Sequence, residues 1–173
     1  MSPQIEGPTI KIEFAPQLRA HAGKLLVGNT ERGREVHAGT FLRRRKIVLD
    51  VALKGQTSEL TRILVHELFH FVWLRLGNPK RRSFEDLLRK ELRERAPGEL
   101  GWSAEHLKIK LHRRDSADRT RRWREYACES FCDTAAWLFS ASGRHREFTL
   151  PLTQRRARRA WFQRTQLTRR ISV

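Results

Sequence analysis

Apolar and polar residues alternate in two stretches of the first half of the chain, and this pattern predicts two β-strands. Residues 9–14, Thr-Ile-Lys-Ile-Glu-Phe, place apolar side chains on one face, which is typical of a half-buried strand. Residues 41–53 alternate in a similar way and are most apolar over residues 46–52. We expect these segments to form a small mixed or antiparallel sheet.

The pattern changes to a helical period after Gly55. Residues 59–76 contain no Gly or Pro, follow the potential N-caps Thr57 and Ser58, and precede a Gly-Asn-Pro stop signal, so a helix is predicted there. Further helices are predicted over residues 83–96, 103–112, 118–142 and 155–164. This order of elements predicts an α+β fold in which the small sheet packs on the first helix and the C-terminal half is helical.

The length of the chain, 173 residues, is enough for one domain with its own hydrophobic core. We expect that domain to span residues 1–143 and to include a helical insertion over residues 80–112. Residues 144–173 contain nine Arg and one Glu. They predict a basic C-terminal extension that is helical in part and frayed at its end.

The sequence His66-Glu67-Leu-Phe-His70 lies in the middle of the predicted helix of residues 59–76. Residues four apart share one face of a helix, so the two imidazoles can bind one metal ion while the Glu67 carboxylate reaches its water. Burying three ionisable groups among apolar neighbours would cost several kcal/mol, which a metal ion offsets. The alternative is a pair of hydrogen-bonded core histidines.

A third ligand is needed, because catalytic zinc is held by three protein ligands and keeps one open position. Glu125, Glu129 and Asp133 are spaced four residues apart in the predicted helix of residues 118–142. A line of acids on a helix that is otherwise rich in small and aromatic residues indicates a cationic counterpart. The alternative is that neighbouring arginines, at positions 121, 122 and 124, neutralise these acids.

These two helices together resemble the gluzincin zinc metallopeptidases, of which thermolysin is an example. The resemblance implies that His66, His70 and Glu129 bind Zn²⁺, that Asp133 orients His66, and that Glu67 is the general base. The motif also fits a register in which Glu125 is the ligand and Glu129 supports it; otherwise Glu125 is a supporting acid. The segment between the two motifs is longer than in thermolysin.

The compact arrangement of strands that lead into the active-site helix is similar to the small regulatory peptidases of the ImmA/IrrE type. A DNA-bound protease of the SprT type is a further possibility, in which a third histidine, His106 or His112, replaces the glutamate ligand. The only tyrosine, Tyr126, and the histidines at 106, 112 and 145 are candidate donors to an oxyanion. Each of them also has an ordinary packing or surface role as its alternative.

Two further predictions concern the strand of residues 46–52 and the two cysteines. A peptide substrate could dock as an extra strand along residues 46–52, if that strand lies at a sheet edge. Cys128 and Cys132 share one helix face, and we expect them to be small buried residues that pack against the His-bearing helix, with metal ligation as the alternative.

The charge is strongly positive, with 36 Lys and Arg against 19 Asp and Glu, which gives a net charge of +17. Such a surface attracts polyanions, so nucleic acid or an acidic partner protein is expected at the Arg-rich surface or the basic C-terminal segment. There is no apolar run near the ~20 residues of a membrane span. Two cysteines give no disulfide framework, and the first residues lack a signal-peptide pattern, so a cytoplasmic location is expected.

The sequence therefore favours a zinc-dependent metallopeptidase that acts on a protein or peptide substrate. In this hypothesis, water activated by the metal attacks the peptide bond with Glu67 as general base. The alternative function, from another class, is a basic nucleic-acid-associated protein in which the zinc site is structural or vestigial.

Overall fold

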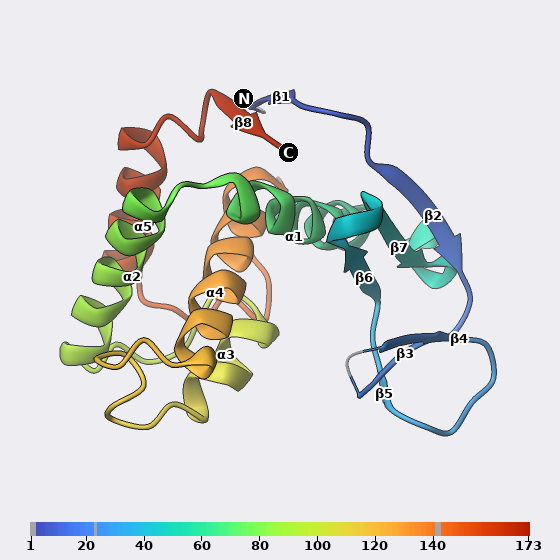
Figure 1. Ribbon diagram of the computed structural model, residues 1–173, viewed down its shortest axis with the longest axis horizontal. Coiled ribbons are helices and arrows are strands. Elements are labelled where there is room, and N and C mark those ends of the chain that lie inside the picture. Colours follow the sequence, from blue (N-terminus) through green and yellow to red (C-terminus); the bar gives the residue numbers. More distant parts are fainter. Residues whose placement is uncertain (1–2, 23, 141–142) are drawn as a thin grey trace.

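The computed structural model describes residues 3–22, 24–140 and 143–173, and it has the expected α+β fold (Figure 1). Its strands are β1 (Gln4–Glu6), β2 (Lys11–Ala15), β3 (Leu18–His21), β4 (Lys24–Val27), β5 (Arg34–Glu35), β6 (Ala38–Phe41), β7 (Lys46–Asp50) and β8 (Arg170–Ser172). Its helices are α1 (Thr57–Arg75), α2 (Asn78–Arg93), α3 (Trp102–Ile109), α4 (Arg121–Phe139) and α5 (Leu152–Arg164), with 3-10 turns η1 (Leu42–Arg44) and η2 (Val51–Gly55).

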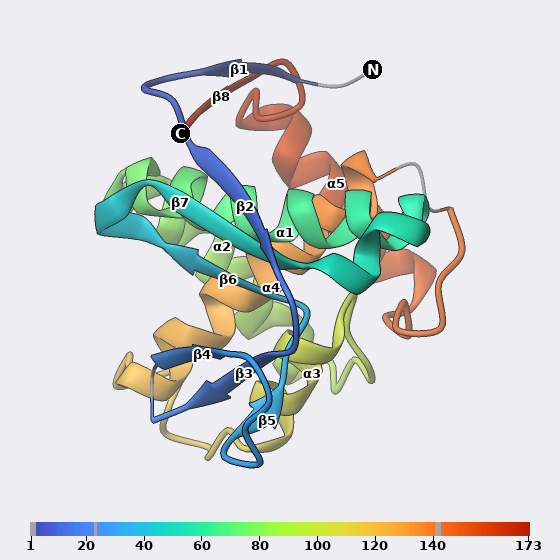
Figure 2. The ribbon, with the colours of Figure 1, turned by 90° about the vertical axis from the view of Figure 1, so that its right-hand side faces the viewer.

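The largest sheet is mixed, in the order β2-β7-β6, with β2 parallel and β6 antiparallel to the central strand β7. Residues 41–53 do not form one strand as predicted, because η1 and the left-handed residue Arg45 (φ 46°) turn the chain back between β6 and β7. A second, antiparallel sheet, β4-β3-β5, precedes β6 in the chain and lies near the start of that strand (Figure 2). Strand β7 is therefore the central strand, and β2 and β6 are the two edge strands.

Helix α1 lies between the three-stranded sheet and the other helices (Figure 1). On the sheet side, Ile47 and Leu49 of β7 are fully buried. On the other side, Phe69 of α1 meets Phe131 of α4 with ring centroids 5.8 Å apart, and Phe131 stacks on Phe162 of α5 at 5.1 Å. Burial of such aromatic side chains is a large source of stability, and here it fixes α1 against α4.

Several predicted helix boundaries are wrong by a few residues. Thr57 lies inside α1, and the residue that precedes the helix, Gln56, makes no capping bond with its side chain. The Gly-Asn-Pro segment starts a helix as well as ending one, because α2 begins at Asn78 with Pro79 in its first turn, where a missing N–H costs nothing. Helix α4 begins after Thr120, whose hydroxyl accepts a hydrogen bond from the backbone N–H of Trp123.

The C-terminal residues are packed into the core and are not an extension beside it, contrary to the prediction for residues 144–173. Trp161 and Phe162 of α5 are buried in the same hydrophobic cluster as α1 and α4. The chain does not end in a frayed segment, because β8 pairs in parallel with β1, and Ile5 lies opposite Ile171 in that register. The two ends of the described chain thus lie side by side (Figures 1 and 2).

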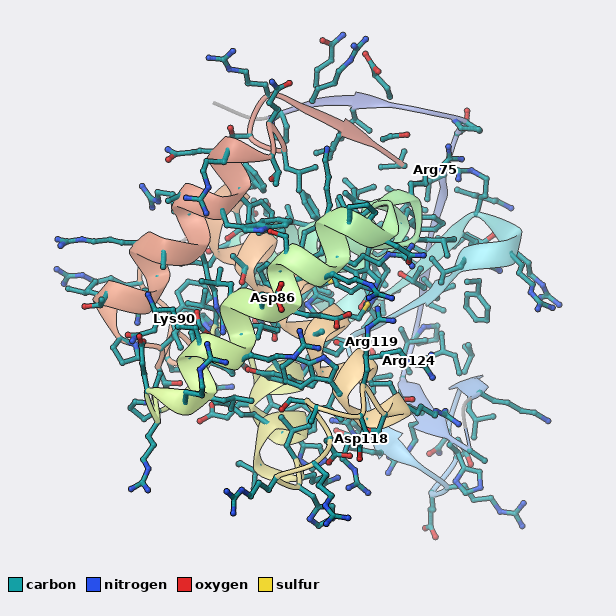
Figure 3. The ribbon with its side chains drawn as sticks, turned by 60° about the vertical axis from the view of Figure 1, so that its left-hand side comes forward. Arg75, Asp86, Lys90, Asp118, Arg119 and Arg124 are labelled. Carbon is teal, nitrogen blue, oxygen red and sulfur yellow. The ribbon has the colours of Figure 1, made fainter. Side chains whose placement is uncertain are left out.

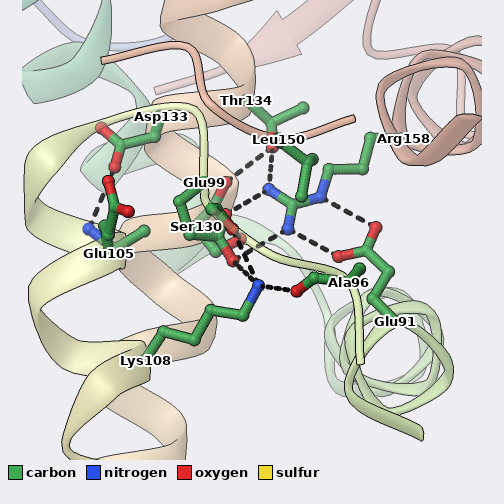
Figure 4. Close-up of polar contacts among 12 residues, drawn as sticks. Glu91, Ala96, Glu99, Glu105, Lys108, Ser130, Asp133, Thr134, Leu150 and Arg158 are labelled. Atoms are coloured by element: carbon green, nitrogen blue, oxygen red, sulfur yellow. Dashed lines mark hydrogen bonds and ion pairs between the residues drawn. The ribbon is translucent and has the colours of Figure 1, made fainter. Parts of the chain in front are cut away.

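A buried ion network connects α5 to α2 and to the loop before α3 (Figure 4). The fully buried guanidinium of Arg158 donates to Glu91 at 3.0 and 2.6 Å and to Glu99 at 2.8 and 3.1 Å. The ammonium of Lys108 lies 3.5 Å from Glu99, so that two cations face two carboxylates. Burial raises the pKa of Glu91, whereas for Glu99 burial is outweighed by Arg158, which lowers the pKa.

Replacing Arg158 with methionine should therefore destabilise the protein strongly. Two carboxylates would remain buried without their main partner, which typically costs about 3–5 kcal/mol. Denaturant unfolding followed by circular dichroism measures this loss. The matched control is Arg156→Met on the exposed side of the same helix, which should change stability by less than about 0.5 kcal/mol; equal effects of the two substitutions would show that the network does not stabilise the fold.

Candidate metal centre

Helices α1 and α4 bring His66, His70 and Glu129 together. The Nε2 atom of His66 lies 3.2 Å from Glu129 Oε2, and the Nε2 atom of His70 lies 3.8 Å from Glu129 Oε1. The two imidazole rings are 5.1 Å apart and nearly perpendicular. The Nε2 atoms of both histidines are therefore directed to the same carboxylate, which is the donor set of a possible cation site.

The other ring nitrogen of His66 is held by Asp133, one turn further along α4. Asp133 Oδ1 accepts a hydrogen bond from His66 Nδ1 at 2.7 Å, and Oδ2 accepts one from the backbone N–H of Ala104 at 3.1 Å. Ala104 lies in the first turn of α3, where free N–H groups and the helix dipole favour an anion. Asp133 thus fixes which nitrogen of His66 is left for Glu129.

Gly101, just before α3, leaves the space that Asp133 occupies. A Cβ atom at this position would lie 2.3 Å from the Cγ and Oδ1 atoms of Asp133, far closer than van der Waals contact allows. The backbone of Gly101 is extended (φ −178°), a conformation open to any residue, so the requirement for glycine here comes from space alone.

Glu67 is placed beside the same cluster by the edge strand β6. Its Oε2 atom accepts a hydrogen bond of 2.6 Å from the hydroxyl of Thr40, which also contacts the Glu67 carbonyl at 3.2 Å. One ligand atom each from His66, Glu67 and His70 lie within 4.8 Å of one another. Thr40 therefore keeps the Glu67 carboxylate close to both imidazoles.

These side chains line one pocket of about 510 Å³. Its walls come from β5, β6, α1, the start of α3 and α4, and they also include the partly exposed Trp102. Arg34 lies over the Trp102 ring, with its guanidinium carbon 4.2 Å from the ring centroid. Glu67 and Glu129 thus share this pocket with the Arg34–Trp102 pair.

The charged groups of the cluster shift one another's pKa values. Burial and the neighbouring imidazoles act in opposite directions on Glu129, and the imidazoles prevail, which lowers its pKa to about 2. Burial likewise opposes the charge on His70, but the hydrogen bond with Cys128 and the Glu129 carboxylate raise its pKa to about 9. For His66, the Asp133 carboxylate outweighs burial and raises the pKa well above its usual value. Each buried carboxylate is thus balanced by a positive charge.

Glu125 does not belong to the centre. Its side chain is exposed and forms an ion pair of 2.6 Å with Arg121, one turn earlier on α4. The reason is geometric, because residues eight apart on a helix differ in direction by about 80°, so a stripe that faces α1 at Asp133 has turned toward solvent by Glu125. Of the two registers that the sequence left open, the geometry therefore brings Glu129 to the histidines.

Tyr126 is also directed away from the pocket. It is fully buried, and its hydroxyl donates a hydrogen bond of 2.5 Å to Glu99 in the buried ion network. Burial raises the pKa of Tyr126 well above its usual value. The expectation that Tyr126 could donate to an oxyanion is therefore wrong for this conformation.

The remaining candidate histidines lie outside the cluster of His66 and His70. His106 is exposed and stacks on Trp102 at 4.7 Å. His112 is exposed on the loop after α3, and His145 Nε2 lies 3.3 Å from Glu59. None of these three lines the pocket among the residues that the structure describes.

Cys128 and Cys132 face the opposite edge of the His70 ring. Their sulfur atoms lie 3.5 and 3.6 Å from His70 Nδ1. The hydrogen bond with Cys132 is the largest influence on the Cys128 thiol and lowers its pKa to about 6, although burial opposes this. The predicted packing against the His-bearing helix is confirmed, but only Cys132 is buried and Cys128 is half-buried. The contact is polar and is made with a candidate ligand.

The sequence did not reveal Thr40, Gly101, Trp102 or the backbone of Ala104 as parts of the centre. They come from β6 and from the start of α3, which are distant from both motifs in the chain. Threonine is common in strands and glycine is common just before helices, so no local pattern singles these residues out.

The surface on the α2 side is rich in charge. Arg75, Lys90 and Arg124 are exposed there, with Asp86 among them (Figure 3). A shallow cleft of about 650 Å³ between the end of α2 and the segment after α3 has no acidic side chain among its described lining residues. Its basic lining consists of Arg89, Arg93, Arg95, Lys108, His112 and Arg113.

Comparisons with protein-family models, with curated proteins and with solved structures each found no match. Over the described residues, every helix falls short of the length and apolar character that a bilayer-spanning helix requires. Because no comparison found a match, any chemistry proposed for the centre depends on its own side chains.

Replacing Gly101 with alanine should release His66 from Asp133. The added methyl group would displace the Asp133 carboxylate, so the His66 Nδ1 proton should lose its strong hydrogen bond. In the wild-type protein, we expect that proton to give a far-downfield, slowly exchanging NMR signal, which Gly101→Ala should shift upfield or abolish. Gly55→Ala is the control, because nothing lies within 4 Å of a Cβ at that position; an unchanged signal in Gly101→Ala would contradict the role assigned to this glycine.

Proposed function

We propose that this protein is a zinc-dependent metallopeptidase of the gluzincin kind. The observation that carries the proposal is the convergence of His66 Nε2, His70 Nε2 and the Glu129 carboxylate in one pocket, with Glu67 beside them. The HExxH motif and a downstream acid could occur by chance in sequence. Their meeting in space, across two helices, favours a common function.

The donor set fits zinc. Two ligands at ~2.0–2.1 Å in a tetrahedral site are about 3.4 Å apart, and the nitrogen–oxygen distances of the cluster are 3.2 and 3.8 Å. The Nδ1 atom of His66 is occupied by Asp133, an arrangement that commonly supports metal-binding histidines. His66, His70 and Glu129 would therefore hold the ion, and one position would stay open to the pocket.

When bound, zinc acts as a Lewis acid that polarises a carbonyl group and makes water a better nucleophile near neutral pH. The residues of the chain provide the proton transfers and the positioning. Glu67 faces the pocket and can accept a proton from water and deliver it to the leaving amine. The hydroxyl of Thr40 donates to one oxygen of Glu67, which leaves the other oxygen available for that transfer.

A peptide substrate fits the edge strand β6 better than the strand over residues 46–52, which the sequence suggested and which the sheet places at its centre. The backbone N–H of Asp50 donates to the carbonyl of His37 at 2.8 Å. Hydrogen-bonded pairs alternate in antiparallel strands, so Ala38 and Thr40 direct their N–H and C=O groups away from β7. An added peptide strand can pair with these groups, and it would pass the Glu67 side chain.

Replacing Glu67 with glutamine should abolish peptide cleavage and retain the metal. The amide cannot accept the proton, and loss of a general base typically lowers the rate about 10²–10⁴-fold. The measurement is mass spectrometry of a mixture of unstructured peptides, together with zinc content by elemental analysis. His66→Ala should lose both zinc and cleavage, whereas Glu125→Gln, the exposed glutamate on α4, should change neither.

A wild-type protein without zinc and without cleavage would contradict the proposal. If such a protein also bound DNA with an affinity that falls with salt, the alternative function would replace it. That function, a nucleic-acid-associated or acidic-partner-binding protein, is favoured by the acid-free basic cleft between α2 and the segment after α3. A cytoplasmic location is consistent with either function and stays a prediction.

Replacing Ala38 with proline should weaken substrate binding without loss of zinc. Proline is tolerated on an edge strand where the N–H points away from the sheet, so β6 should still form. The missing donor should raise KM about tenfold, since one intermolecular hydrogen bond is worth about 1 kcal/mol or more. Steady-state kinetics on a cleaved peptide measures this change, and an unaltered KM would place the substrate elsewhere.

A further inference from the structure

The His70 ring has a second cluster of potential ligands on its other side. Its Nδ1 atom lies 3.5 Å from Cys128 Sγ and 3.6 Å from Cys132 Sγ. One ligand atom from each of the three residues lies within 4.8 Å of the other two. Neither cysteine lines the pocket that contains Glu67 and Glu129, so this cluster is separate from the proposed zinc ligands except for the shared ring.

The two nitrogen–sulfur distances match those of a tetrahedral metal site. With a metal–nitrogen bond of ~2.0–2.1 Å and a metal–sulfur bond of ~2.3 Å, the nitrogen and sulfur ligands of a tetrahedron lie about 3.6 Å apart. Both observed nitrogen–sulfur distances are within 0.1 Å of this value. The spacing of the cysteines, one helical turn apart on α4, puts both sulfurs on the side that faces α1.

We propose that Cys128, Cys132 and His70 Nδ1 form a second metal-binding site, selective for thiophilic ions such as Cd²⁺, Cu⁺ or Zn²⁺. Sulfur and imidazole ligands favour these ions over Mg²⁺ or Ca²⁺. The thiols lose their protons to solvent when the ion binds, and two thiolates neutralise a divalent cation. That neutrality suits a position where Cys132 is fully buried, whereas Cys128 and His70 are partly exposed and give access to ions.

The second site and the proposed zinc site exclude one another. A neutral imidazole has one nitrogen with a free lone pair and one nitrogen that carries a proton. An ion at the thiols takes the Nδ1 lone pair of His70, which leaves Nε2 as an N–H group directed at Glu129. An ion at His66 and Glu129 requires the opposite tautomer. Thiophilic ions therefore compete with zinc for His70 without entering the zinc position.

Titration of the chelator-treated, reduced protein with Cd²⁺ alone tests the site. Binding to thiolates produces an ultraviolet charge-transfer absorption that binding to imidazole and carboxylate does not. We expect this absorption to saturate at about one Cd²⁺ per chain. Cys128→Ser and Cys132→Ser should each abolish the band or weaken Cd²⁺ binding at least about tenfold, whereas His66→Ala, which removes only the proposed zinc site, should keep it.

Two further controls separate loss of the metal site from loss of folding. Circular dichroism shows whether each cysteine variant is folded, and Cys132→Ala replaces Cys132→Ser if the buried hydroxyl prevents folding. Absence of the band in the wild type, or its persistence in a folded Cys132 variant, would overturn the site whether or not the protein is a peptidase. The exclusion rests on the proposed zinc site: Cys128→Ser should still bind one Zn²⁺ and His66→Ala one Cd²⁺, whereas the wild type dialysed with both ions should hold about one ion per chain in total by elemental analysis. Two ions per chain in the wild type would refute the exclusion.

Discussion

The carboxylate of Asp133 joins three helices at the point where the candidate metal centre is built. The side chain belongs to α4, one oxygen accepts from His66 on α1, and the other accepts from the N–H of Ala104 on α3. Because both oxygens are occupied and the group is buried, neither the carboxylate nor the His66 ring can rotate without losing a hydrogen bond. The direction of His66 Nε2 toward Glu129 follows from this constraint.

Residues 80–112 and 144–173, which the sequence predicts to be an insertion and an extension, hold α4 in the position that this constraint needs. Helix α3 supplies the N–H group for Asp133, and α2 and the following loop supply Glu91 and Glu99 to Arg158 of α5. The guanidinium of Arg158 also donates to Thr134 at 3.2 Å, the residue after Asp133. The ion network therefore holds α4 directly beside the candidate metal centre.

The sequence predicted the parts of the molecule that depend on local periodicity. It placed the HExxH segment on a helix, and it identified Glu129 and Asp133 as acids one turn apart, because a helix repeats every 3.6 residues whatever surrounds it. It could not predict which sheet strand is at the edge, or that Tyr126 would be bound by Glu99, since both depend on contacts between distant segments. Glu125 was misjudged for a related reason: spacing shows that Glu125 and Asp133 point in directions about 80° apart, but which of the two faces the histidines depends on how α4 crosses α1.

The pocket around His66 and His70 and the cleft between α2 and the segment after α3 differ in the charge of their lining residues. The pocket is lined by five acids, Glu35, Glu67, Glu129, Asp133 and Glu147, against the two arginines Arg34 and Arg62. Arg62 is already paired with Glu59 and Glu147, so its charge does not repel a cation. The cleft near α2 and α3 has basic residues and no acidic residue among its described lining, so its charge favours a polyanion more than that of the pocket does. The pocket and the cleft share no described lining residue, so a cation at the histidines and a polyanion at the cleft would not compete for the same side chains.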